Sequence, residues 1–153
     1  MSNNFVIEKL SAKNFDEFVS LIRRLADYER LEPPNKEAVR RLKNDGLSKN
    51  PKYEAYLGKI SNNYVTYIMF FMGYSSFLAK PTLFWEDLFV LKDYRGKGIG
   101  QSMFNFCIKK AKERKCGRID GCILDWNKPS IEFFEKNNAK RLNWLYYRIN
   151  LVN

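Results

Sequence analysis

The chain has 153 residues, of which 45% are hydrophobic and 16% aromatic, enough apolar material for one globular domain with a buried core. It carries 27 Lys and Arg against 17 Asp and Glu, a net charge of +10, and it contains no histidine. The missing imidazole excludes Ser-His and Cys-His nucleophile pairs and the commonest zinc ligand. Acid–base chemistry therefore falls to carboxylates, tyrosines, lysines or water.

The N-terminus, the apolar runs and the cysteines predict a cytoplasmic protein. Residues 1–4 are polar and lack the basic-then-apolar pattern of a secretory signal, and the longest apolar run, Tyr64 to Tyr74, is too short to span a bilayer. The chain has an odd number of cysteines, and none of them forms a Cys-x-x-Cys pair; they are Cys107, Cys116 and Cys122. We expect reduced thiols that pack in the core, with no metal site.

The first third of the chain predicts one strand and two helices. A strand is expected near Phe5 to Lys9. A helix follows, because apolar residues recur at helical spacing from Phe15 to Ala26; its expected N-cap is Asn14, and it ends near Glu29. A shorter helix capped by Asn35 is expected from Lys36 to Lys43, because an Asn-Asp-Gly turn signal comes directly after it.

The middle of the chain is rich in predicted strands. Strands at Tyr53 to Ile60 and Tyr64 to Tyr74 flank a Ser-Asn-Asn turn, and a third strand at Leu83 to Val90 follows a loop around Pro81. Short connections between successive strands predict an antiparallel meander.

A basic, glycine-rich turn follows the third of these strands. It reads Arg95-Gly96-Lys97-Gly98-Ile99-Gly100 and opens a predicted helix that extends to about Arg114. Glycines let successive N–H groups converge on one anion at a helix start, so the turn predicts a cradle for a phosphorylated ligand. The run lacks the Gly-Lys-Ser/Thr ending of a P-loop and the Gly-x-Gly-x-x-Gly spacing of a dinucleotide site. A flexible turn that binds nothing is the alternative.

The remaining elements complete a crossover unit and a C-terminal pair. A strand at Arg118 to Leu124 would lie parallel to the strand before the glycine turn. Pro129 suits the first turn of a helix reaching Asn137 or Asn138, and Trp144 to Val152 predicts a final strand. No repeat or linker interrupts the chain, so we expect a single domain over residues 1–153.

The Arg-x-x-Gly-x-Gly run resembles the pyrophosphate-binding motif of the GNAT acetyltransferases. The surrounding segments are most similar to the diamine (spermidine/spermine) acetyltransferase subgroup; they are Leu25 to Glu29, Trp85 to Val90 and Asp125 to Phe134. The resemblance implies an α/β (α+β) domain of the GNAT fold, with a mixed central sheet flanked by helices in the order β-α-α-β-β-β-α-β-α-β. It also implies a homodimer.

The resemblance implies acetyl-CoA as co-substrate. In the family, the strand before the glycine turn hydrogen-bonds the pantetheine arm, the turn holds the pyrophosphate, and the next helix adds further contacts. The matching cofactor-binding positions are Leu88, Phe89, Val90, Arg95, Gly96, Lys97, Gly98, Ile99, Gly100, Gln101, Asn127, Ser130 and Phe134.

The resemblance also implies roles for acidic residues. Glu86 matches the general base, and Tyr28, Glu29, Glu86 and Asp87 match or adjoin positions that contact the amine acceptor. An adjacent Glu-Asp pair in an apolar strand is costly to bury, which independently indicates a charged partner or a function. The subgroup's general-acid tyrosine is replaced by Phe134, so another tyrosine or water would have to protonate the leaving thiolate.

These observations predict an acetyl-CoA-dependent N-acetyltransferase that acts on a small di- or polyamine-like primary amine. A protein lysine or N-terminal acetyltransferase and a non-catalytic acetyl-CoA-binding module are the alternatives. The net charge of +10 would repel a polycation at long range and keeps a nucleic-acid-binding domain as a rival, although the basic residues are spread along the chain.

Overall fold

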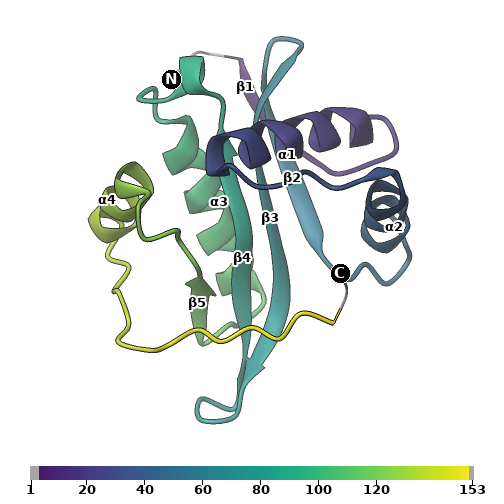
Figure 1. Ribbon diagram of the computed structural model, residues 1–153. Helices are drawn as coiled ribbons and strands as arrows, with labels where there is room; N and C mark the ends of the chain where they lie inside the picture. The colour runs from purple at the N-terminus through teal and green to yellow at the C-terminus, as the bar shows by residue number, and fades with distance from the viewer. Residues whose placement is uncertain (1–3, 152–153) are drawn as a thin grey trace. The chain divides into compact units, whose positions relative to one another are not determined.

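A computed structural model describes residues 4–151 of the protein (Figure 1). The described chain comprises two compact units, one that ends at Gly121 and one that begins at Cys122. The single domain expected from the sequence stays a prediction. Within the described residues, no helix combines the length and apolar character needed to cross a membrane.

The first unit contains a sheet and three α-helices among its described residues. In chain order its elements are β1 (Phe5–Lys9), α1 (Phe15–Glu29), α2 (Lys36–Gly46), β2 (Glu54–Ile60), β3 (Asn63–Ser75), β4 (Lys80–Val90), a 3-10 turn η1 (Lys92–Tyr94), α3 (Ile99–Glu113) and β5 (Arg118–Gly121). The second unit contains α4 (Lys128–Lys136).

The sheet has five strands in the order β1-β2-β3-β4-β5. The first four strands are antiparallel neighbours, whereas β4 and β5 are parallel. The expected meander, crossover unit and mixed sheet are therefore confirmed. Helices α1 and α3 cover opposite faces of this sheet (Figure 1).

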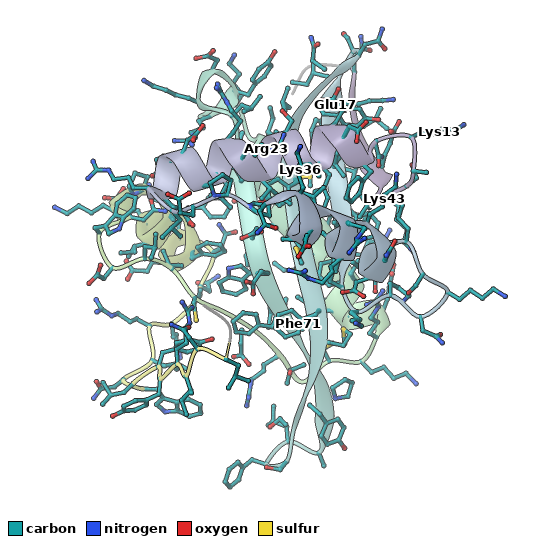
Figure 2. All side chains as sticks on the ribbon, turned by 45° about the vertical axis from the view of Figure 1, so that its right-hand side comes forward. Lys13, Glu17, Arg23, Lys36, Lys43 and Phe71 are labelled. Carbon is teal, nitrogen blue, oxygen red and sulfur yellow. The ribbon has the colours of Figure 1, made fainter. Side chains whose placement is uncertain are left out.

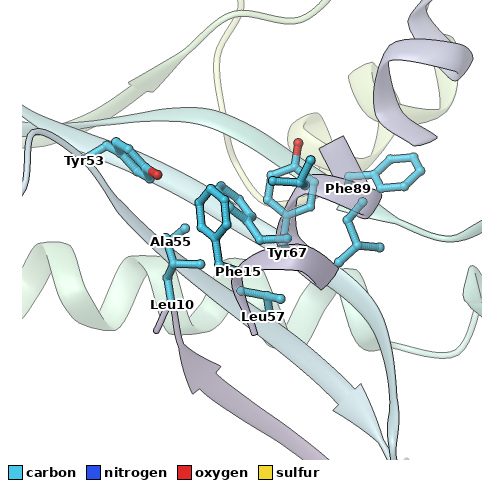
Figure 3. Packing of buried hydrophobic residues seen from close by; sticks show 10 residues of the cluster. Leu10, Phe15, Tyr53, Ala55, Leu57, Tyr67 and Phe89 are labelled. Atoms are coloured by element: carbon cyan, nitrogen blue, oxygen red, sulfur yellow. The ribbon is translucent and has the colours of Figure 1, made fainter. Parts of the chain in front are cut away.

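The core under α1 combines aromatic and aliphatic side chains (Figure 3). Phe18 of α1 is fully buried, with its ring edge-on to Tyr67 of β3 at 5.3 Å and stacked near Tyr53 at 6.2 Å. Burying a side chain of this size contributes roughly 1.5–3 kcal/mol. The apolar side chains that recur at helical spacing in α1 thus pack this helix against the sheet.

Two helix ends differ from their sequence predictions. Asn14 occupies the predicted N-cap position of α1, where its backbone carbonyl accepts from the Phe18 N–H (3.0 Å). Its side chain makes no capping bond, because its amide accepts from the Ser11 N–H (2.8 Å) and donates to the Lys9 carbonyl (3.1 Å). Helix α2 continues through the Asn-Asp-Gly signal to Gly46, since the Tyr53 hydroxyl donates to the Leu42 carbonyl (2.6 Å) and packs over this last turn. The Asn35 cap of α2 is confirmed, with its side chain accepting from the Ala38 N–H at 2.9 Å.

Two predicted strand bounds are wrong by three residues each, and one predicted strand does not form. β4 begins at Lys80 because its pairing with β3 reaches the Ser75–Lys80 pair, and β5 stops at Gly121. Residues 144–151 form no strand; Val152 lies outside the described residues. The described part of the second unit contains no other strand, so this segment has no partner there, and Trp144 is 78% exposed.

The three cysteines are thiols, as expected. Cys107 is buried in α3, which confirms its packing role, and burial raises the pKa of its thiol to about 12. Cys122 is exposed, so core packing is the wrong role for that residue.

Charged side chains lie over the outer surfaces of the helices (Figure 2). Glu17 and Arg23 on α1 and Lys36 and Lys43 on α2 are all exposed. The positive charge is therefore distributed over the surface of these elements, as the sequence predicts.

Candidate active site

The glycine turn connects β4 to α3 through a left-handed backbone. Gly96 and Gly98 have φ of 72° and 79°, values that favour glycine, and Gly98 is the N-cap of α3. A Cβ at either position would meet no described atom within 4 Å. The first N–H groups of α3 have no helical carbonyl partner and carry the positive end of the helix dipole. The open surface here therefore suits an anion.

The two cations of the turn fold back onto it. The Arg95 Nε donates to the Val90 carbonyl (2.9 Å), and its guanidinium lies 4.8 Å above the Tyr28 ring at the end of α1. The Lys97 Nζ donates to the Asp93 carbonyl (2.9 Å). Arg95 thereby joins the predicted cofactor turn to the predicted acceptor residues on α1.

A β-bulge lies in β4 at Glu86. Met69 pairs with Asp87 whereas Phe70 pairs with Trp85, so Glu86 is the extra residue of β4. Because of the extra residue, the side chains after the bulge lie on the opposite face of the sheet from the one that simple alternation would give them. Trp85 contacts Phe104 of α3 on one face (ring centroids 6.1 Å apart), while Asp87 lies on the other face with Tyr67. Glu86 itself is exposed.

The bulge brings three acidic residues together beside α1. Burial raises the pKa of Asp87 to about 6, and the charges of Glu86 and Glu29 add to this effect. Burial likewise raises the pKa of Glu29, again with a contribution from Glu86. The Tyr67 hydroxyl donates to Oδ2 of Asp87 (3.0 Å) and opposes the shift at Asp87. Sequence reasoning found the carboxylates and missed Tyr67, whose only signal is a polar atom in an apolar strand.

The raised pKa of Asp87 predicts a pH-dependent stability. An ordinary Asp titrates at 3.8 and Asp87 at about 6, so the folded state binds the proton more tightly, and this carboxyl lowers the free energy of unfolding as pH rises from about 4 to 6. Asp87→Asn should therefore stabilise the protein by about 1–3 kcal/mol at pH 7.5 and change little at pH 4. Urea unfolding at both pH values measures this, and an equal effect at both would contradict it.

The backbone of β4 extends beyond its parallel neighbour. Pairing with β5 ends at Trp85–Gly121, whereas β4 continues to Val90. Gly121 lies against the Trp85 ring, where a Cβ would overlap it. The predicted pantetheine-binding residues, Leu88 to Val90, thus follow the last β4–β5 pair. Side chains already bond to carbonyls of this segment: the Phe89 carbonyl accepts from the Thr66 hydroxyl (2.6 Å), and the Val90 carbonyl accepts from the Arg95 Nε (2.9 Å).

The other predicted site residues lie in the second unit. Asn127 is buried and caps α4, where its Oδ1 accepts from the Ser130 N–H (3.4 Å), and Pro129 lies in the first turn as expected. Phe134 is buried with its ring edge-on to Phe133 (5.2 Å). Their roles toward a ligand stay predictions.

Known proteins resemble this chain in sequence or in fold. The model of the acetyltransferase (GNAT) family matches residues 16–139. The thialysine N-epsilon-acetyltransferase of Bos taurus is 28% identical over 130 residues, covering 80% of this chain and 76% of the relative. The L-ornithine N5-acetyltransferase NATA1 of Arabidopsis thaliana is 34% identical over 93 residues, 60% of this chain and 41% of the relative. The crystal structure of a ribosomal-protein-alanine N-acetyltransferase from Brucella melitensis superimposes with a TM-score of 0.78 at 21% identity, covering 97% of this chain and all of that one, a likeness of fold.

Proposed function

Because the chain belongs to the GNAT acetyltransferase family, we propose that it transfers the acetyl group of acetyl-CoA to a small di- or polyamine-like primary amine. The acetyltransferase class follows from the family. The acceptor and the residues that act on it are the proposal. The observation that carries the proposal is the acidic cluster of Glu29, Glu86 and Asp87 next to the glycine turn.

The glycine turn supports a role in holding the acetyl-CoA pyrophosphate. Its two left-handed glycines leave open space at the start of α3, a helix of 15 residues. A diphosphate there would accept hydrogen bonds from backbone N–H groups, with Lys97 adding positive charge nearby. The pantetheine arm would then extend along Leu88 to Val90 toward Glu86.

The acidic cluster supports a cationic acceptor. A molecule with two amines presents one nitrogen for acetylation and a second, charged nitrogen that carboxylates hold. Two relatives are named as acetyltransferases of thialysine and of ornithine, and both of these molecules carry more than one amine. A local cluster of carboxylates attracts such a molecule at short range, although the whole chain has a net charge of +10.

Glu86 is the proposed general base. The acceptor must lose a proton from its ammonium group before the nitrogen attacks the thioester carbon, and the exposed Glu86 carboxylate on the bulge receives that proton directly or through water. A C–N bond forms, the C–S bond breaks, and CoA leaves as its thiolate. Because a free thiol has a pKa of about 8.5, the thiolate is a tolerable leaving group even though Phe134 has no proton to donate.

A panel of acceptors tests the proposal. Release of CoA thiol should depend on a diamine, spermidine, thialysine or ornithine, and should be at least tenfold slower with single-amine compounds, because the second charge adds binding. Phe134→Tyr should raise kcat severalfold by supplying the missing acid. Turnover of short peptides alone would favour the protein N-acetyltransferase alternative, and acetyl-CoA binding without any turnover would favour the non-catalytic one.

We also infer a cytoplasmic homodimer. The family resemblance implies the dimer, and the outer end of the β3–β4 hairpin carries apolar side chains that homodimers commonly bury. These exposed residues are Phe71 (Figure 2), Met72, Tyr74, Phe77 and Leu78.

A further inference from the structure

Tyr67 places a polar atom at the centre of an apolar cluster. Its side chain is fully buried on β3 and packs against Phe18 and Phe89 (Figure 3). An unbonded hydroxyl there would be destabilising, but this one donates to Oδ2 of Asp87 at 3.0 Å. Tyr67 pairs across the strands with Phe89, so it reaches Asp87 along the diagonal of the β3–β4 ladder.

The bulge makes this contact feasible. With strict alternation, Asp87 would share the face of Trp85, which packs against α3. The extra residue at Glu86 instead puts Asp87 on the face of Tyr67 and α1. A fully buried hydroxyl therefore fixes one carboxylate of the proposed acceptor site.

The charges around Asp87 favour its protonated form. Glu86 comes from the same strand and Glu29 from the end of α1, and both are negative. Among the described residues, the hydrogen bond from Tyr67 is the one identified influence on Asp87 that favours the carboxylate. Without it, burial and repulsion would act on Asp87 unopposed.

We propose that Tyr67 is a positioning residue of the acceptor site, whose hydroxyl orients Asp87 and keeps it ionised when a dicationic amine is to be bound. The inference rests on the proposed function, because it assumes that the three carboxylates receive the amine. Tyr67 itself touches neither the acceptor nor acetyl-CoA in this account. It acts through Asp87 alone.

Tyr67→Phe removes the hydroxyl and keeps the ring. Tyr53→Phe is a matched control, because Tyr53 belongs to the same core cluster and its hydroxyl bonds the Leu42 carbonyl, a neutral group. Both variants lose one buried hydrogen bond, so both report the general effect of that loss on the fold. Only Tyr67→Phe should alter a carboxylate.

Two measurements report the ionisation of the Asp87 carboxylate. In a 13C NMR titration of side-chain carboxyls, assigned with Asp87→Asn, the midpoint of Asp87 should rise by about 1 pH unit or more in Tyr67→Phe and stay unchanged in Tyr53→Phe. In steady-state assays with spermidine, Tyr67→Phe should raise the acceptor KM about twofold at pH 7, because a midpoint near 7 in place of about 6 halves the ionised fraction of Asp87. At pH 9 the acceptor KM should approach the wild-type value. The KM for acetyl-CoA should change less than twofold.

Three results would overturn the inference: an unchanged Asp87 midpoint, an acceptor KM raised equally at pH 7 and pH 9, or the same effect of Tyr67→Phe in an Asp87→Asn background. If no amine is turned over, the proposed function fails, yet the titration still decides whether Tyr67 governs Asp87. If amines are turned over with an unaltered pH profile, the proposed function stands and the role of Tyr67 is packing alone.

Discussion

Gly98→Glu should raise the Kd for acetyl-CoA by roughly 100-fold or more. The new carboxylate would occupy the open space at the start of α3, where it repels a diphosphate and competes for the N–H groups that should bind it. Losing one or two charge-assisted hydrogen bonds at about 1.5–3 kcal/mol each accounts for this magnitude. Isothermal titration with acetyl-CoA measures the effect directly.

Gly98→Ala is the matched control for this substitution. Both variants force a side chain onto a backbone with φ of 79°, a strain of about 1–2 kcal/mol. A negative charge at a helix N-terminus does not itself weaken the helix, so the two variants should unfold at similar urea concentrations. If the affinity for acetyl-CoA falls equally in both variants, backbone strain causes the loss and repulsion of the diphosphate by the new carboxylate does not.

Glu86→Gln should lower kcat/KM for the amine by about 100- to 10,000-fold, the usual contribution of a general base. The amide has the shape of the carboxylate but accepts no proton. Glu86 is exposed, so the fold should retain its stability, and acetyl-CoA affinity should stay within about twofold. A stopped assay of acetylated amine at pH 7.5 measures the rate.

The pH profile separates two explanations of a loss in Glu86→Gln. If Glu86 takes the proton, the variant should recover as pH rises, because more of the amine is then already deprotonated. If Glu86 only binds the acceptor, its loss should raise KM and leave kcat unchanged. A variant as active as the wild type would remove Glu86 from the mechanism.

Most of the fold follows from local sequence signals. The apolar period in α1, the Asn35 cap and the glycine turn each predicted an element that the structure contains. The errors arise where tertiary contacts override such signals. Tyr53 extends α2 past Asn-Asp-Gly. The segment of residues 144–151 has no partner strand among the described residues of its own unit, so its apolar residues do not suffice to make a strand.

The site could be predicted as a set of residues and not as a geometry. The Glu86–Asp87 pair and the glycine run are visible in the sequence. The bulge is not, because it is a mismatch between two strands, and the faces of Trp85 and Asp87 depend on it. Tyr67 was missed for the same reason, since its link to Asp87 crosses from one strand to the next.

The central claim is direct transfer of the acetyl group from acetyl-CoA to a small diamine. The most direct test is mass spectrometry of the protein and the amine after mixing with a few equivalents of acetyl-CoA, first without and then with spermidine. We expect an unmodified protein throughout and one acetylated amine for each CoA released. An acetylated protein that forms without spermidine, or CoA release with no acetylated amine, would contradict it.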